Sequence, residues 1–180
     1  NRSSTISSQF ARARAPYIKP TAEQIEGRYR LFGIDPLQKV CAYCGGIQTE
    51  WDHLFAVVEG TQWTGYGTEI GNLIPACGKC NQSRGKQAIR AWMSSSAPWA
   101  PLKVFMERDR MSEEAAQAEV ARRLAIIEYA ISEHGPQKIV YDPSDPDEIE
   151  LEAYRKQLLE LLPKAQAVAA RLQKRYQNQV

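Results

Sequence analysis

Four cysteines, arranged as two Cys-x-x-Cys pairs, constrain this chain more than any other feature of its sequence. The pairs are Cys41 with Cys44 and Cys77 with Cys80, and the sequence holds no other cysteine. Two pairs at this spacing are typical of a tetrahedral zinc site made of four thiolates. Disulfides are the alternative, but they are rare in a reducing cytosol and no secretory signal is recognisable here. We therefore expect a structural Zn²⁺ that joins two distant segments.

Composition indicates an ordinary globular chain. The 180 residues are 43% hydrophobic and 24% charged, which is normal for a soluble protein able to bury a core. A membrane span would need about 18 consecutive apolar residues, and the sequence has no such run. We expect a cytoplasmic protein that does not cross a membrane.

The net charge of +2 hides an uneven distribution. Residues 1–40 carry seven basic against three acidic side chains, residues 111–150 carry three against ten, and residues 151–180 carry six against two. A basic N-terminal arm is suited to the backbone of a polyanion such as DNA. A solvated tail is an equally good interpretation of the arm alone.

Local patterns in the first half of the chain predict an arm, a helix and a hairpin. Residues 1–16 read as the arm, and Thr21 with Gln24 forms a capping box for a helix ending near Gly33. Residues 40–58 alternate like a β-hairpin that turns at Gly45-Gly46. The glycine-rich stretch 60–71 reads as a loop.

Helices dominate the expectations for the second half. One helix is expected over 78–92, and a second begins at Ser112 and stops at Gly135-Pro136. A third begins after Asp145, and Pro163 should kink it. Its apolar residues have a heptad-like spacing: Leu151, Tyr154, Leu158, Leu161, Ala165, Val168 and Leu172. This stripe fits either packing within the chain or a homodimer seam.

The residues that can carry chemistry lie between and just after the cysteine pairs. His53 is the candidate general base, because the other histidine, His134, lies far along the chain. The Asp52 carboxylate and the Asn81 amide oxygen are ligands suited to Mg²⁺ or Mn²⁺. Neighbouring strand residues point to opposite faces, so Asp52 and His53 can share a site only if the strand bends.

The order Cys-x2-Cys, Asp52-His53, Asn72, Cys-x2-Cys and Asn81 resembles the HNH (His-Asn-His, ββα-metal) endonucleases, specifically their zinc-stapled branch. The resemblance covers about residues 40–90. It implies that His53 is the general base, that Asp52 and Asn81 bind the catalytic Mg²⁺ or Mn²⁺, and that Asn72 fixes the loop between the strands. The last signature residue of the family is often histidine, and here it is Asn81.

The resemblance implies an α+β fold with a ββα-metal core. We expect three consecutive parts: a basic arm and short helix over 1–39, the nuclease core over 40–93, and a helical region over 94–180. The expected function is a metal-dependent DNA endonuclease, with a restriction enzyme favoured because extra helices can grip a specific sequence. A non-catalytic, zinc-stabilised DNA-binding or interaction module is the alternative. Candidate contacts to DNA phosphates are Arg28, Arg30, Arg84, Lys86 and Arg90.

Overall fold

The computed structural model describes residues 2–177, which divide into two compact units. The first, here called the cysteine unit, contains residues 16–56 and 66–137. The second, here called the α7 unit, contains residues 1–15, 57–65 and 138–180, of which residue 1 and residues 178–180 lie outside the described part. This division differs from the three consecutive parts that the sequence predicted, because three separate segments of the chain make up the α7 unit.

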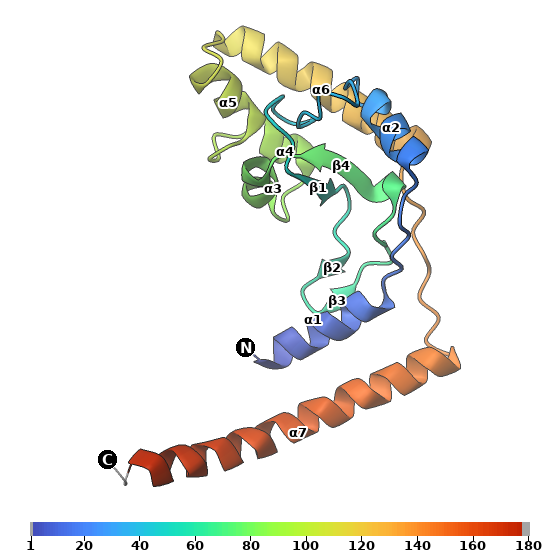
Figure 1. The fold of residues 1–180 in the computed structure, drawn as a ribbon, viewed down its shortest axis with the longest axis vertical. Coiled ribbons are helices and arrows are strands. Elements are labelled where there is room, and N and C mark those ends of the chain that lie inside the picture. The colour runs from blue at the N-terminus through green and yellow to red at the C-terminus, as the bar shows by residue number, and fades with distance from the viewer. Residues whose placement is uncertain (1, 178–180) are drawn as a thin grey trace. The chain divides into compact units, whose positions relative to one another are not determined.

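The cysteine unit combines one small sheet with five helices (Figure 1). Its elements, in chain order, are α2 (Ala22–Leu31), β1 (Glu50–His53), the 3-10 turn η1 (Ile70–Asn72), β4 (Leu73–Ala76), α3 (Gly78–Arg84), α4 (Ile89–Met93), α5 (Pro101–Glu107) and α6 (Glu113–His134). Mixed helices and small sheets agree with the predicted α+β class.

The sheet of this unit pairs β1 with β4 in antiparallel register, with His53 opposite Leu73. The predicted hairpin over 40–58 is therefore wrong. Only an isolated bridge between Val40 and Ile47 closes the Gly45-Gly46 turn. The physical reason is that residues 41–45 turn back on themselves, with the Gly45 amide donating to Cys41 O at 2.8 Å, so they form no strand, and the fully buried β4 is the partner of β1.

The core of the cysteine unit forms where α6 packs against α5 and the cysteine segments. The buried face of α6 consists of Ala116, Val120, Leu124, Ile127 and Ala130. These positions recur every three or four residues, as expected for one face of a helix. Ser112 caps α6 through the Ala115 amide, which confirms the predicted start.

Two other helix predictions have different outcomes. The Thr21–Gln24 capping box of α2 is confirmed, with both reciprocal hydrogen bonds present. The single helix expected over 78–92 is instead two helices, α3 and α4. Gly85 separates them, and its φ of 51° is a conformation that a helix cannot contain.

The α7 unit contains α1 (Arg2–Arg14), the short strands β2 (Val58–Glu59) and β3 (Gln62–Trp63), and the long helix α7 (Pro146–Gln177). The predicted arm and loop are thus partly regular structure. Helix α1 packs against β3 and α7, with an ion pair of 2.6 Å between Arg14 Nε and Glu148 Oε2. These contacts with α7 explain why a serine- and arginine-rich segment folds as a helix.

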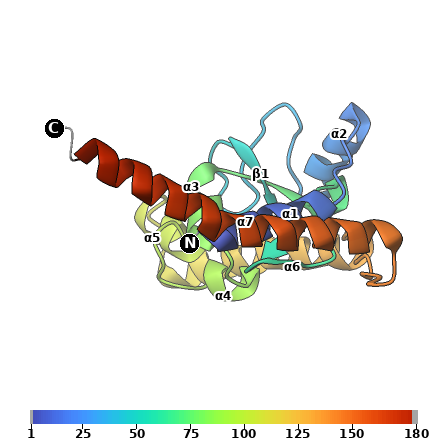
Figure 2. The same ribbon diagram turned by 90° about the horizontal axis from the view of Figure 1, so that it is seen from below.

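Helix α7 begins as predicted, with the Asp145 side chain accepting from the Asp147 amide at 2.9 Å. It continues through Pro163 without interruption, and Figure 2 shows the single long helix. Much of its apolar stripe is exposed: Leu158 is 45%, Leu161 55%, Val168 47% and Leu172 37% accessible. None of the helices within residues 2–177 is both long and apolar enough to cross a membrane.

Candidate metal centre and associated residues

The four cysteines converge in the cysteine unit, as the sequence predicted. Their sulfur atoms all lie within 4.8 Å of one another, and the Sγ atoms of Cys44 and Cys77 are 3.8 Å apart. A tetrahedral zinc ion with Zn–S bonds of about 2.3 Å places its sulfurs about 3.8 Å from each other. The cluster could therefore hold one metal ion.

Backbone hydrogen bonds shape both ends of the cluster. In the first pair, the Gly45 amide donates to Cys41 O at 2.8 Å and the Gly46 amide approaches Cys44 Sγ at 3.4 Å. Gly45 has a φ of 70°, a conformation that favours glycine. In the second pair, Cys77 caps α3 by accepting from the Cys80 amide at 3.5 Å. Amides aimed at sulfur favour thiolates, which are the form that binds metal.

The proximity of the sulfurs separates their acidities. Hydrogen bonding to Cys41 lowers the pKa of Cys44 to about 7. Hydrogen bonds from the neighbouring thiols, that of Cys41 first, also lower the pKa of Cys77. The same network raises the pKa of Cys41, with Cys44 as the largest cause, and that of Cys80. Without a cation the four thiols therefore do not all ionise together. Four thiolates this close would need a cation to balance their charge, and their soft sulfur donors fit a divalent metal such as zinc.

His53 ends β1 and is half-buried. Its Nε2 atom lies 2.8 Å from Thr68 Oγ1. Thr68 is itself fixed through its backbone, because its amide donates to Pro16 O and its carbonyl accepts from the Ile18 amide, each at 2.9 Å. The hydroxyl that contacts the imidazole is therefore held on a defined segment.

Asn72 is fully buried and bonds to two separate backbone segments. Its Oδ1 accepts from the Phe55 amide at 2.8 Å, and its Nδ2 donates to Phe55 O at 3.0 Å and to Gly67 O at 2.8 Å. Phe55 follows β1, and Gly67 precedes Thr68. One amide side chain thus ties the end of the His53 strand to the segment that carries its hydroxyl partner.

Asp52 lies on the opposite face of β1 from His53, and it is buried. Its Oδ2 accepts from Arg84 Nε at 2.7 Å and from the Tyr43 hydroxyl at 2.9 Å. Its Oδ1 accepts from Arg84 Nη2 at 2.8 Å. Both carboxylate oxygens are thus engaged within the fold, and the structure does not bring Asp52 beside His53.

Arg84 has a structural position that the sequence did not predict. Its guanidinium also donates to His53 O at 2.6 Å, and its side chain is 8% exposed. Burial lowers the pKa of Arg84, but the hydrogen bond and charge of Asp52 outweigh burial and leave the pKa raised. The prediction that Arg84 binds DNA phosphate is corrected, because this cation joins α3 to β1.

Asn81 is placed on the first turns of α3, where it meets a carboxylate that we did not predict. Its Nδ2 donates to Glu50 Oε2 at 2.6 Å. Glu50 is two residues before Asp52, so the two acidic side chains share one face of β1. That alternation is the sequence signal that could have identified Glu50.

The other predicted phosphate contacts divide into one buried residue and three exposed ones. Arg28 is buried and donates to three backbone carbonyls, those of Leu73, Gly71 and His134, at 2.7, 2.9 and 3.3 Å. Burial lowers its pKa to about 10. Arg28 therefore supports the fold, which corrects its assignment to DNA.

Among the exposed three, Arg30 pairs with Glu26 and Arg90 with Glu128, while Lys86 lies on the surface after α3.

Comparison with known proteins finds no matching family model, no matching curated protein and no matching solved structure. The geometry alone thus supplies a four-cysteine cluster that could hold a metal ion and, close to it in sequence, an imidazole that contacts Thr68 at the end of a short strand.

Proposed function

We propose that the chain is a DNA endonuclease that hydrolyses phosphodiester bonds with His53 as its general base. One observation carries the proposal: His53 is a half-buried imidazole whose Nε2 contacts Thr68 Oγ1 at 2.8 Å. If the hydroxyl accepts the proton of Nε2, the basic nitrogen of the ring is Nδ1. A base orientated in this way suits proton transfer from water.

The proposed reaction is a displacement at phosphorus. His53 takes a proton from water, the water oxygen forms a bond to phosphorus, and the bond from phosphorus to the 3′ oxygen breaks. The leaving 3′ oxygen takes up a proton from solvent. The products carry a 5′-phosphate and a 3′-hydroxyl. A divalent cation would supply charge stabilisation at the leaving oxygen. The Asp52 oxygens do not fit that ion as they stand, because Arg84 and Tyr43 occupy them, so we assign no step to it.

The four-cysteine cluster is proposed to hold Zn²⁺ with a structural role. Four protein ligands complete a tetrahedral ion and leave no position for water or substrate. The metal would connect the segment before β1 to the start of α3. It would thereby stabilise the sheet that carries His53.

Cleavage of supercoiled plasmid DNA tests the proposal, with Mg²⁺ and Mn²⁺ as separate arms. His53→Ala should reduce the rate by about 10²-fold or more, the usual contribution of a general base. His134→Ala is the matched control, because His134 is the other histidine of the chain and lies exposed at the end of α6. Equal rates for wild type and His53→Ala in both metals would contradict the enzyme assignment.

The restriction-enzyme proposal is finer and needs a separate readout. A sequence-specific enzyme yields discrete fragments from a long DNA of known sequence. A nonspecific nuclease yields a continuous smear. A smear at limiting enzyme concentration would leave the nuclease proposal standing and remove the restriction role.

A second candidate is a zinc-stabilised DNA-binding module without catalysis. The pairing of Asp52 with Arg84 favours this candidate, because a carboxylate whose oxygens are already paired with an arginine is not available to bind a catalytic ion. Binding of duplex DNA by the wild type without cleavage in either metal would select this candidate.

A further inference from the structure

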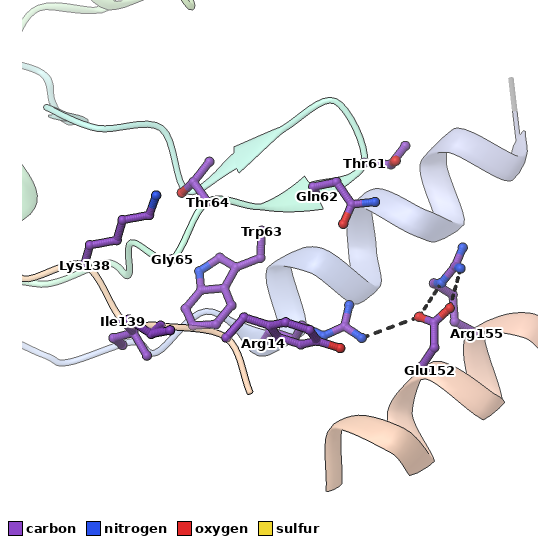
Figure 3. A pocket seen from close by; sticks show the side chains of 12 residues that line it. Arg14, Thr61, Gln62, Trp63, Thr64, Gly65, Lys138, Ile139, Glu152 and Arg155 are labelled. Carbon is purple, nitrogen blue, oxygen red and sulfur yellow. Dashed lines mark hydrogen bonds and ion pairs between the residues drawn. The ribbon is translucent and has the colours of Figure 1, made fainter. Parts of the chain in front are cut away.

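The α7 unit contains a cavity of about 750 Å³ to which the proposed function assigns no role. Figure 3 shows the side chains that surround it. They come from α1, from β3 and the residues on either side of it, from the segment before α7, and from α7 itself: Arg14, Thr61, Gln62, Trp63, Thr64, Gly65, Lys138, Ile139, Val140, Tyr141, Glu152 and Arg155. Its size lies within the range of small-molecule sites.

One wall of the cavity depends on Gly65. The Ile139 amide donates to Gly65 O at 2.8 Å, which holds the segment before α7 against the end of β3. Gly65 has a φ of 90°, and a Cβ at this position would lie 2.6 Å from Ile139 O and 2.9 Å from Lys138 Cγ. Only glycine permits so close an approach, so the wall is specified by the sequence.

Aromatic surfaces contribute to the lining at two places. Trp63 is half-buried on β3, and Tyr141 is 46% exposed. The Arg14 guanidinium carbon lies 5.8 Å from the centre of the Tyr141 ring. A partly exposed indole and a tyrosine ring with a guanidinium beside it offer the kind of aromatic surface on which single-stranded nucleic acid bases stack.

The charge of the lining is positive. Glu152 pairs with Arg155 at 2.5 Å and with Arg14 at 3.5 Å, and the hydrogen bond from Arg155 lowers its pKa. Glu148, outside the lining, takes a further contact of 2.6 Å from Arg14. Within residues 2–177 no ion pair is found for Lys138. Lys138 is therefore the cation available to an anionic ligand.

We propose that this cavity binds one unstacked nucleotide, with the base stacked on Trp63 and the phosphate near Lys138. The aromatic surface and the uncompensated cation select this ligand class, because an apolar ligand would not need Lys138 and a simple anion would not need Trp63. The proposal extends the proposed function, since it assumes that the ligand is part of a nucleic acid substrate. The nucleotide could belong to a strand or be free.

Fluorescence anisotropy with a labelled single-stranded oligonucleotide tests the stacking. All proteins carry His53→Ala, so that cleavage cannot affect the result. Trp63→Ala should weaken binding about tenfold, since stacking on one aromatic residue contributes about 1–3 kcal/mol. Trp63→Phe should retain most of the affinity. Trp99→Ala is the matched control, because Trp99 is 45% exposed and belongs to the cysteine unit.

An oligonucleotide of the same length with abasic sugars supplies the decisive comparison. Wild-type protein should bind it about tenfold more weakly, and Trp63→Ala should weaken that binding no further. If Trp63→Ala affects both oligonucleotides equally, the residue does not contact a base and the proposal fails. Circular dichroism of each variant verifies that the fold is retained, and Trp63→Phe keeps the comparison valid if the alanine variant unfolds.

Lys138→Gln tests the phosphate contact. It should lower the slope of log affinity against log salt by about 0.7, the value for one phosphate on a single strand. Lys103→Gln on α5 should leave the slope unchanged. If Lys138→Gln lowers the salt slope but Trp63→Ala leaves the affinity unchanged, the cavity is a simple anion site and the proposal is overturned.

A competition titration, with deoxynucleoside monophosphates added to the complex with the labelled oligonucleotide, distinguishes a site for a free nucleotide from a site for one residue of a strand. Binding of the monophosphates, weakened by Trp63→Ala, supports a site for a free nucleotide. Their failure to compete, together with base-dependent oligonucleotide binding, supports a residue within a strand. Base-dependent binding would stand even if plasmid cleavage did not depend on His53, so the two proposals fail separately.

Discussion

Removing one partner of the Asp52–Arg84 pair should destabilise the cysteine unit severely. The two side chains are 6% and 8% exposed and share two hydrogen bonds of 2.7 and 2.8 Å. Arg84→Met keeps most of the side-chain volume and removes the charge, whereas Asp52→Asn keeps the shape and removes the anion. Either change leaves the other charged group buried without its counter-ion.

The magnitude follows from that burial. Breaking a buried pair by removing one partner costs about 3–5 kcal/mol of the free energy of unfolding. Urea unfolding of a small protein has a slope of about 2 kcal/mol per molar, so the midpoint should fall by about 1.5–2.5 M. The Asp52→Asn/Arg84→Met double variant should lose less than the sum of the two single losses, because no unpaired charge remains.

Tryptophan fluorescence and far-UV circular dichroism can follow this unfolding at a fixed zinc concentration. Trp92 is fully buried and packs edge-to-face on Tyr43 at 5.1 Å, and Tyr43 donates to Asp52. The fluorescence therefore includes a signal from beside the pair. A midpoint shift below about 0.5 M for both single variants would refute the reasoning, because the pair would then behave like a solvent-exposed one.

Three further predictions concern the metal, the loop and the long helix. A chelator that strips the four-cysteine cluster should reduce the helical circular dichroism of the protein, and elemental analysis before treatment should find about one zinc per chain; unchanged spectra would contradict a structural metal. Asn72→Ala should cost about 3 kcal/mol in urea unfolding, from three lost hydrogen bonds of about 1 kcal/mol each; a loss below about 1 kcal/mol would show that water replaces the amide. Pro163→Ala should stabilise α7 by up to about 3 kcal/mol, seen as slower hydrogen exchange of its amides, and equal exchange would show that the helix already tolerates the proline.

The features that the sequence predicted correctly depend on neighbouring residues. The Thr21–Gln24 box, the Ser112 cap and the Asp145 cap each join groups within one helical turn. The four-cysteine cluster is the one long-range feature that was also predictable. It was predictable because two Cys-x-x-Cys pairs have few other uses. The structure confirms that the four sulfur atoms lie close together.

What the sequence could not show is which polar groups become buried partners. Arg28 and Arg84 look like surface charge in a basic chain, yet Arg28 binds a carbonyl 45 residues away and Arg84 a carboxylate 32 residues away. The sequence did not predict the pairing of β1 with β4 for the same reason, because this pairing depends on the burial of β4. Glu50 was missed since its contact with Asn81 requires α3 to lie on that face of β1.

The small size of the sheet links the metal to any chemistry at His53. Strands β1 and β4 have four residues each, and a two-stranded sheet of that length is marginal in water by itself. Three devices hold it instead: the sulfur cluster beyond the ends of the strands, the Arg84 bridge on one face, and Asn72 at the end near His53. Loss of the metal should therefore disturb the imidazole through the sheet that carries it. Metal removal and Asn72→Ala should both abolish cleavage. His53→Ala should reduce cleavage by about 10²-fold or more and lower the urea midpoint by no more than about 0.5 M, which corresponds to one lost hydrogen bond of about 1 kcal/mol. A destabilised His53→Ala protein would instead mean that the imidazole is a structural part of the sheet.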